Sequence, residues 1–271
     1  ADVRNLKSLN PGLKELLDER GIGGQVGLVA FDEALNATRY DDIVAGLKGF
    51  DCRPADELMA AVRRSLRSRE ISAIKHAAGL ARAAAEALAT AHSAGASNGA
   101  AVVEADGEAR RLGALDVRCL ANLDGTNQLV PLEELTSFRT DSMVAYVAVN
   151  SLGYWADLGV TLGSPGLLEE AERALQAMLA GVKAGAEASD VARLAEQQLS
   201  EQHLHEAQLY GLGNGLALSL DAAPHISPFS HDSLVENTVL SLRVRIGSET
   251  GPGALASALV LVKPDGCEKL G

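Results

Sequence analysis

The sequence is poor in aromatic residues and in basic charge, and both shortages narrow the classes of protein it can belong to. Tryptophan, tyrosine and phenylalanine make up 3% of the 271 residues, whereas apolar residues reach 47%. The core is therefore expected to be aliphatic, and its many alanines favour closely packed helices. Lysine and arginine number 24 against 36 acidic residues, a net charge of −12. Binding to nucleic acid or to an anionic membrane surface requires clustered basic residues, so neither partner is expected.

Cysteines and long apolar runs are also scarce. Cys52, Cys119 and Cys267 are far apart and odd in number, without the spacing of a metal or redox motif. No apolar run approaches the roughly 18 residues of a membrane span, and residues 1–11 contain no signal-peptide core. These absences predict a protein of the reducing cytoplasm.

The first part of the chain predicts a small unit of alternating helices and strands. Helical spacing at residues 12–18 is followed by a glycine turn and by the short apolar strand 25–31. A second helix at 40–47 and a strand at 49–52 complete the unit before Pro54.

The remainder of the chain predicts an α+β domain of two similar halves. A long alanine-rich helix at 69–92 has apolar residues at three- and four-residue steps, namely Ile71, Ile74, Ala78, Ala81, Ala85 and Leu88. Strands are predicted at 100–103, 117–120 and 143–149, and helices at 167–183 and 191–202. A second group of strands is predicted at 205–210, 216–220, 239–245 and 256–262. A helix, a strand block, two helices and a second strand block suggest a repeated architecture.

Four segments in this order resemble one known family. They read SREISAIKHAA at 68–78, DSMVAYVAVNSLGYWADLGVTL at 141–162, YGLGNGLALSLDAAPHISP at 210–228, and a closing strand at 253–266 that ends in the letters PDG. They resemble the opening helix, the aspartate-bearing strand–turn–strand, the histidine-bearing glycine loop and the closing strand of the pita-bread family. Creatinase, aminopeptidase P, prolidase and methionyl aminopeptidase belong to that family.

The resemblance covers residues 55–271 and implies a pita-bread domain there. Residues 1–54 resemble the trailing part of the small α/β domain that precedes it in those proteins, so we expect a truncated N-terminal unit. Family members commonly form dimers, and a homodimer or a heteromer with a related subunit is therefore expected.

The resemblance also implies where two metal ions would be held, between two aspartates, a histidine and two glutamates. Those five positions fall, in chain order, on Tyr146, Asp157, Leu212, Arg243 and Ser257. Two further family histidines that contact the substrate fall on Leu132 and Ser219. Leucine cannot ligate a cation, arginine repels one, and a single carboxylate cannot offset two dications. The residues therefore predict no metal and no working metallopeptidase, and no other cofactor is expected.

Asp157 and Arg243 should point into the same central cavity if the fold is right. An unpaired carboxylate or guanidinium is costly to bury, so we hypothesise that Arg243 pairs with Asp157 in place of the metals. The alternative is that Arg243 turns outward beside Arg245 while backbone amides bond Asp157. Because Arg243 and Arg245 share one face of a regular strand, this alternative requires a bulge or a solvent-facing strand.

Several other polar residues are weaker candidates. His203 and His205 would share a face of a strand, as metal ligands can, but no third ligand lies at useful spacing. His225 and His231 flank Pro228 near the expected cavity mouth, and either is a candidate acid–base group. The glycine loop at 211–215 precedes a strand, so its glycines are expected to permit close backbone approach and not to cradle phosphate.

The favoured function is a metal-free pita-bread protein that binds a small anionic or peptide-like ligand, or that acts as a subunit partner. The candidate ligand-binding residues are Asp157, Arg243, Tyr146, Ser219 and Ser257. The alternative is a metal-independent hydrolase or lyase in the same cavity, with Tyr146, Asp157, Arg243 and His225 as candidate catalytic residues. A third interpretation relocates a metal to His203 and His205.

Overall fold

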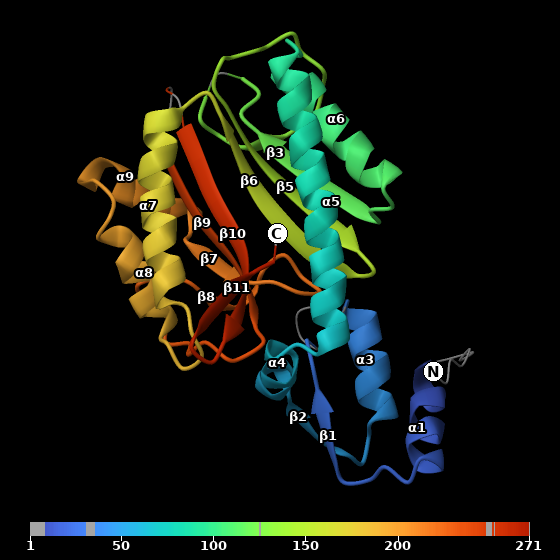
Figure 1. Ribbon diagram of the computed structural model, residues 1–271. Helices are drawn as coiled ribbons and strands as arrows, with labels where there is room; N and C mark the ends of the chain where they lie inside the picture. The colour runs from blue at the N-terminus through green and yellow to red at the C-terminus, as the bar shows by residue number, and fades with distance from the viewer. Residues whose placement is uncertain (1–8, 31–35, 125, 248–250, 252, 271) are drawn as a thin grey trace. The chain divides into compact units, whose positions relative to one another are not determined.

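A computed structural model describes residues 9–30, 36–124, 126–247, 251 and 253–270 (Figure 1). The chain divides into two compact units, Ala1–Arg63 and Arg64–Gly271. This division, between residues 63 and 64, lies nine residues beyond the predicted boundary between residues 54 and 55. No helix among the described residues is both long enough and apolar enough to cross a membrane.

The first unit has the predicted order of helix, strand, helix and strand, followed by a helix that was not predicted. These are α1 (Leu9–Glu19), β1 (Gln25–Leu28), α3 (Ala37–Gly46), β2 (Asp51–Pro54) and α4 (Asp56–Arg64). Strands β1 and β2 run parallel, with Gln25 opposite Asp51. The Asn36 side chain accepts a hydrogen bond from the amide of Arg39 and so begins α3. Residue 31, the predicted end of the first strand, lies outside the described residues.

The second unit contains two antiparallel sheets, each with its own helices (Figure 1). The helices are α5 (Ser68–Ser93), α6 (Asn98–Arg111), α7 (Pro165–Gly181), α8 (Ala188–Glu196) and α9 (Glu201–Tyr210). One sheet has the order β4-β3-β5-β6, from β3 (Asp116–Ala121), β4 (Val130–Pro131), β5 (Met143–Ser151) and β6 (Tyr154–Leu162). The other has the order β11-β10-β9-β7-β8, from β7 (Gly213–Gly215), β8 (Ala222–His225), β9 (Val239–Gly247), β10 (Gly253–Lys263) and β11 (Gly266–Lys269).

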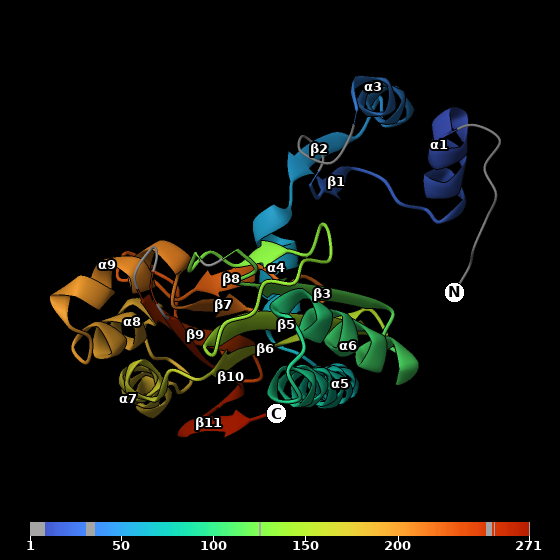
Figure 2. The same cartoon turned by 90° about the horizontal axis from the view of Figure 1, so that it is seen from above.

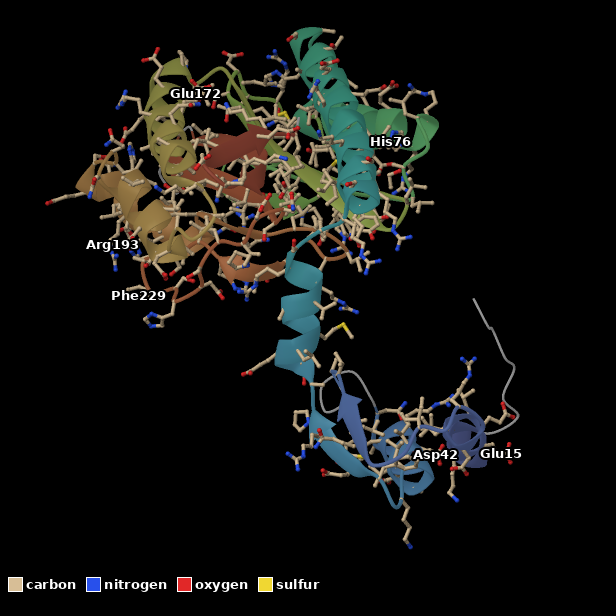
Figure 3. All side chains as sticks on the ribbon, turned by 60° about the horizontal axis from the view of Figure 1, so that its bottom comes forward. Glu15, Asp42, His76, Glu172, Arg193 and Phe229 are labelled. Atoms are coloured by element: carbon tan, nitrogen blue, oxygen red, sulfur yellow. The ribbon has the colours of Figure 1, made fainter. Side chains whose placement is uncertain are left out.

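Helices α5, α6 and α7 cover one face of these sheets. In the view from above, α5, α6 and α7 lie on one side, and β8 with its neighbouring loops lies on the other (Figure 2). The predicted apolar stripe of α5 packs inward: Ile74 and Leu88 are fully buried, whereas His76 is exposed on the outer side (Figure 3). Each fully buried leucine or isoleucine contributes about 1.5–3 kcal/mol, so this stripe holds α5 on the sheet.

The two sheets meet where β6 runs beside β10. The amide of Gly159 donates to Oγ of Ser257 over 2.6 Å, and the amide of Leu255 donates to Oγ1 of Thr161 over 2.8 Å. A Cβ at residue 159 would lie 2.6 Å from Cγ of Leu255, so only glycine permits this approach. The seam joins the two halves and leaves one shared face opposite the helices.

Three strand predictions were wrong. Residues 100–103 lie in α6, where Ala101, Ala105 and Ala109 are buried at four-residue steps, a helical period that the short apolar run concealed. Residues 205–210 form the second half of α9, which begins after Ser200. Residues 216–220 lie outside the strands, because β7 ends at Gly215 and a turn follows.

Candidate functional site

Asp157 lies at the centre of the shared face. It is on β6, where the register places Ala148 opposite it and Gly159 opposite Tyr146, so that Tyr146 and Asp157 are diagonal neighbours on one face. The carboxylate is buried, with 6% of the residue exposed. Its Oδ2 accepts hydrogen bonds from the Tyr146 hydroxyl over 2.9 Å and from the Ser241 hydroxyl over 2.7 Å. Two hydroxyl donors therefore satisfy this carboxylate.

Arg243 faces the same side but bonds a different partner. Its Nη2 donates to Oδ1 of Asn214 over 2.7 Å, whereas Asp157 accepts from Tyr146 and Ser241. The hypothesis of a direct Arg243–Asp157 pair was therefore wrong, and so was the outward-facing alternative. The hydroxyls of Tyr146 and Ser241 occupy the carboxylate, and the amide oxygen of Asn214 offers the guanidinium a neutral acceptor.

Arg245 shares this face of β9 and is the least satisfied polar side chain of the site. Only 2% of the residue is exposed, and Nε, Nη1 and Nη2 all lack a hydrogen-bond partner among the described residues. The Tyr210 ring covers one face of the guanidinium, with its centroid 3.6 Å from Cζ. Burial lowers the pKa of Arg245 to about 10, although the negative charge of Glu206 acts to raise it. The group is therefore still protonated at neutral pH.

Tyr146, Arg243 and Arg245 line a cavity of about 520 Å³, whereas Asp157 is not part of its lining, contrary to the expectation that Asp157 and Arg243 share one cavity. Tyr146, Asn214, Arg243 and Arg245 contribute polar groups to its wall, as do Asp221, His225 and Ser227, and the Tyr210 ring also lines it. The apolar wall is formed by Leu120, Leu129, Leu220, Ile226 and Leu255. Cavities of this size and apolar character, with a few convergent polar groups, are typical of small-molecule sites.

His225 lies at the edge of this cavity, as expected from its position in the loop region. It ends β8 and is exposed, and its Nε2 is 3.0 Å from Oδ1 of Asp221, which also lines the cavity. The imidazole and the carboxylate are thus in hydrogen-bonding contact at the edge of the cavity. His231, the other candidate, lies in the exposed loop that follows β8.

The remaining predicted site residues lie around this cavity or behind it. Ser219 is in the exposed turn after β7, where its hydroxyl accepts from the amide of Asp221. Ser257 is opposite Arg243 in the β9–β10 pair, and its hydroxyl is engaged by the amide of Gly159. Leu132 packs against the core formed by α5, α6 and the first sheet.

The glycine loop places a different residue in the site from the one predicted. Leu212 is buried in the core under α7 and α8, behind the sheet. Asn214 is opposite Ser241 in the β7–β9 pair and faces the cavity. The close approach expected of these glycines is confirmed at Gly213, because a Cβ there would lie 2.4 Å from the Ser241 carbonyl oxygen. Sequence reasoning also missed Ser241, although it precedes Arg243 by two residues and so shares its face.

The donor set does not fit a pair of metal ions. Asp157 is the one carboxylate among the five family positions, its partners are the hydroxyls of Tyr146 and Ser241, and Arg243 adds a positive charge where dications would need negative ones. Within the described residues, no group of three or more histidine, cysteine, aspartate and glutamate side chains is placed to hold a metal ion. No step of chemistry is therefore assigned to a metal.

The histidine pair at 203 and 205 does not form the expected shared face, because both residues lie on α9 and two residues on a helix point in different directions. Nδ1 of His203 is 3.0 Å from Oε1 of Glu170, a partner on α7. His205 is exposed. Cys119 is mostly buried, and burial raises the pKa of its thiol to about 12, which leaves it unreactive at neutral pH.

Burial raises the pKa of the Asp157 carboxyl above its usual range, and the hydroxyls of Ser241 and Tyr146 and the charge of Arg243 act in the opposite direction. Burial and the Asp157 charge likewise raise the pKa of Tyr146, so its hydroxyl keeps its proton and acts as a donor. Asp157 accepts a hydrogen bond from each of these two hydroxyls.

We expect Asp157→Asn to gain stability relative to the unsubstituted protein as pH rises. A carboxyl whose folded pKa exceeds its unfolded value favours the folded state at low pH. It loses that contribution as pH increases through the folded pKa, by about 1.4 kcal/mol for each unit of pKa difference. The asparagine retains an acceptor for Tyr146 and Ser241 but does not titrate. Urea unfolding of both proteins from pH 4 to pH 8 measures the difference, and a difference constant across this range would contradict the raised pKa.

Comparison with known proteins identifies the family. The sequence pattern of metallopeptidase family M24 matches residues 51–264. An X-Pro aminopeptidase from Thermotoga maritima MSB8 superposes with a TM-score of 0.83 at 20% identity, over 99% of this chain and 79% of that one. A prolidase from Pyrococcus furiosus gives 0.80 at 17% identity, over 99% and 80%. An Xaa-Pro dipeptidase from Bacillus anthracis gives 0.80 at 19% identity, over 96% and 75%.

At these identities the likeness to solved structures shows the fold alone, and it confirms the predicted pita-bread domain. A comparison with curated protein sequences finds no match. The family pattern spans well over half of the chain, from the last strand of the first unit to the closing strands of the second. The protein therefore belongs to metallopeptidase family M24.

Proposed function

We propose that this protein is a metal-free member of its family that binds a small anionic or peptide-like ligand in the 520 Å³ cavity and does not work as a metallopeptidase. The observation that carries the proposal is the presence of Arg243 and Arg245 side by side on the cavity wall, where the resemblance places one of the family's metal-binding glutamates. Two guanidinium groups reverse the charge of the site. A pocket that held cations would thereby become one that attracts anions.

The shape of the cavity supports a binding role. Leucine and isoleucine side chains form much of its wall, and the polar groups converge from β5, β7 and β9. Arg243 is already oriented by its hydrogen bond to Asn214, and Asn214 is in turn held by bonds from its Nδ2 to the carbonyls of Gly215 and Leu220. A pre-oriented guanidinium loses little side-chain entropy when an anion binds.

Metal removal is expected to leave the protein unchanged. After dialysis against a chelator, elemental analysis should find no stoichiometric manganese, cobalt or zinc, and readdition of each ion should not move the thermal midpoint. Hydrolysis of X-Pro dipeptides with any of these ions should stay at the rate of the buffer. One or two bound equivalents that restore hydrolysis would refute the proposal.

Ligand binding is expected to raise the thermal midpoint, since a ligand that binds only the folded state adds about 2.7 kcal/mol at a concentration 100 times its Kd. A screen of small carboxylates and of di- and tripeptides tests this directly. Arg243→Met should weaken the binding of any anionic hit, whereas Arg193→Met, a change on α8 outside the cavity lining, should not (Figure 3). The proposal fails if no compound shifts the unsubstituted protein.

The His225–Asp221 pair favours a second candidate, a metal-independent hydrolase or lyase. In this case His225 would exchange a proton with a substrate anchored by the arginines, because it lines the same cavity. Tyr146 is unsuited as the base because its raised pKa keeps it protonated. Conversion of a bound hit on prolonged incubation, lost in His225→Gln but with unchanged affinity, would favour this enzyme over a binding protein.

A further inference from the structure

Arg245 is a buried cation that the fold leaves without a partner. In folded proteins, buried charged groups are almost always paired or hydrogen-bonded, because an isolated charge in a medium of low dielectric constant is costly. Here all three guanidinium nitrogens lack a partner among the described residues, and only 2% of Arg245 is exposed. Glu206 on α9 is close enough to act on the guanidinium charge, yet its carboxylate accepts from Nδ2 of Asn127.

The geometry of the guanidinium shows which part of it lacks a partner. Tyr210 stacks on one flat face, 3.6 Å from ring centroid to Cζ. The N–H bonds of a guanidinium lie in its plane, so a stacked ring leaves them without a hydrogen bond. The same arginine lines the cavity beside Arg243. Its free edge therefore matches the fork-shaped pairing that a planar carboxylate accepts.

We propose that Arg245 is the anchoring residue of the cavity and that it binds the carboxylate of a small monocarboxylic acid with an apolar body; this deepens and rests on the proposed ligand-binding function. The apolar body would lie against Leu120, Leu129, Ile226 and Leu255. Arg243 adds a second positive charge beside the carboxylate.

The surrounding carboxylates select a monoanion over a phosphate dianion. Asp221 lines the cavity, Glu206 lies near Arg245, and Asp157 lies behind Tyr146. A second negative charge on the ligand would be repelled by Asp221 and Glu206, whereas one charge is attracted by the unpaired guanidinium and by Arg243. Because the guanidinium nitrogens are buried, a ligand reaches them only if a neighbouring side chain moves, and Tyr210 is the ring stacked on the guanidinium. This residue ends α9 before Gly211, whose φ of 75° marks a sharp change of direction, and it is 38% exposed.

The proposal is tested with matched acids and amides. Isothermal titration calorimetry on the full chain would use 4-methylpentanoate and phenylacetate with their neutral amides, and inorganic phosphate as the dianionic probe. We expect the acids to bind and the amides and phosphate to bind at least 10-fold more weakly. Arg245→Met should weaken the acids by about 10- to 100-fold, which is the range expected for a lost charged hydrogen-bonded pair. Arg245→Lys keeps the positive charge but loses the fork-shaped pair of N–H donors. Its affinity for the acids should therefore lie between those of the unsubstituted protein and of Arg245→Met.

The outcomes separate this inference from the function on which it rests. Unchanged acid affinity in a folded Arg245→Met protein, with loss in Arg243→Met, would overturn Arg245 as the anchor and leave the binding function standing. If the amides bind as tightly as the acids, the assignment of the ligand as a carboxylate is overturned, while the binding function stands. If neither the acids nor any compound of the wider peptide screen binds, both the function and the inference fail. Thermal unfolding of each variant confirms that it is folded.

Discussion

Replacing Arg245 by methionine is expected to stabilise the ligand-free protein. The guanidinium is buried without hydrogen-bond partners, and exchanging buried ionic groups for apolar ones of similar volume commonly raises the free energy of unfolding by about 1–4 kcal/mol. Methionine retains the unbranched stem, and its sulfur can contact the Tyr210 ring that now stacks on the guanidinium. A protein of this size should then melt about 2–4 °C higher for each kcal/mol gained.

The pH dependence of this gain has a defined sign. The pKa of Arg245 is lowered to about 10 in the folded protein, below its usual value, so the charged form disfavours folding. Below pH 9 the group is charged in both the folded and the unfolded states, and the penalty is constant. Denaturant unfolding at pH 6, 7 and 8 should therefore give the same difference between Arg245→Met and the unsubstituted protein.

Arg243→Met is the matched control, because the residue lies two positions away on the same strand face and differs in having a partner. Its removal leaves Oδ1 of Asn214 without the donor it now has, which is expected to lower the free energy of unfolding by about 1–3 kcal/mol. The two substitutions thus have opposite signs. A loss of stability in Arg245→Met as large as that in Arg243→Met would mean that Arg245 has a partner in solution.

The opposite effects of Arg245→Met on stability and on acid binding connect the two arguments. A site that recognises an anion keeps an unsatisfied cation in the absence of its ligand, and the rest of the fold offsets that cost. If the arginine were purely structural, its replacement would lower the stability of the protein and leave the affinity for the acid unchanged. A higher melting temperature together with a weaker affinity for the acid is therefore specific to a binding residue.

The parts of this site that lie on regular strands could be predicted from the sequence. Tyr146 and Asp157 are eleven residues apart across a tight hairpin, so the alternation of side chains places them on one face once the turn is recognised. The same alternation puts Arg243 and Arg245 together, and the structure confirms it. The aliphatic core also follows from composition, since leucine, valine, isoleucine and alanine dominate its buried residues.

The irregular parts could not be predicted in the same way. The glycine loop has no hydrophobic period, and the residue that faces the cavity depends on where the short strand β7 pairs with β9. Assigning the histidine position to Leu212 missed Asn214, and with it the acceptor that holds Arg243 away from Asp157. Residues 205–210 of α9 were assigned to a strand, because apolar residues are few in this helix and show no helical period, and only Ala207 in it is buried.

Gly213→Ala is expected to cause the largest loss of stability among single changes near the site. Gly213 has a φ of 145°, which side-chain-bearing residues rarely adopt, and its added Cβ would lie 2.4 Å from the carbonyl oxygen of Ser241. The obstructing atom belongs to the backbone of β9, so it cannot turn aside. Backbone strain and overpacking together should lower the free energy of unfolding by about 3–5 kcal/mol.

Gly79→Ala provides the control, because this glycine is in the interior of α5, exposed, and has no atom within 4 Å of the added Cβ. The alanine should raise the free energy of unfolding by about 0.5–1 kcal/mol through its greater helix propensity. Urea unfolding measures both variants. Since Gly213 sets the approach of β7 to β9, its substitution should also move Asn214 and weaken acid binding. A Gly213→Ala protein as stable as the unsubstituted one would show that the β7–β9 pairing, and with it the placement of Asn214 beside Arg243, is wrong.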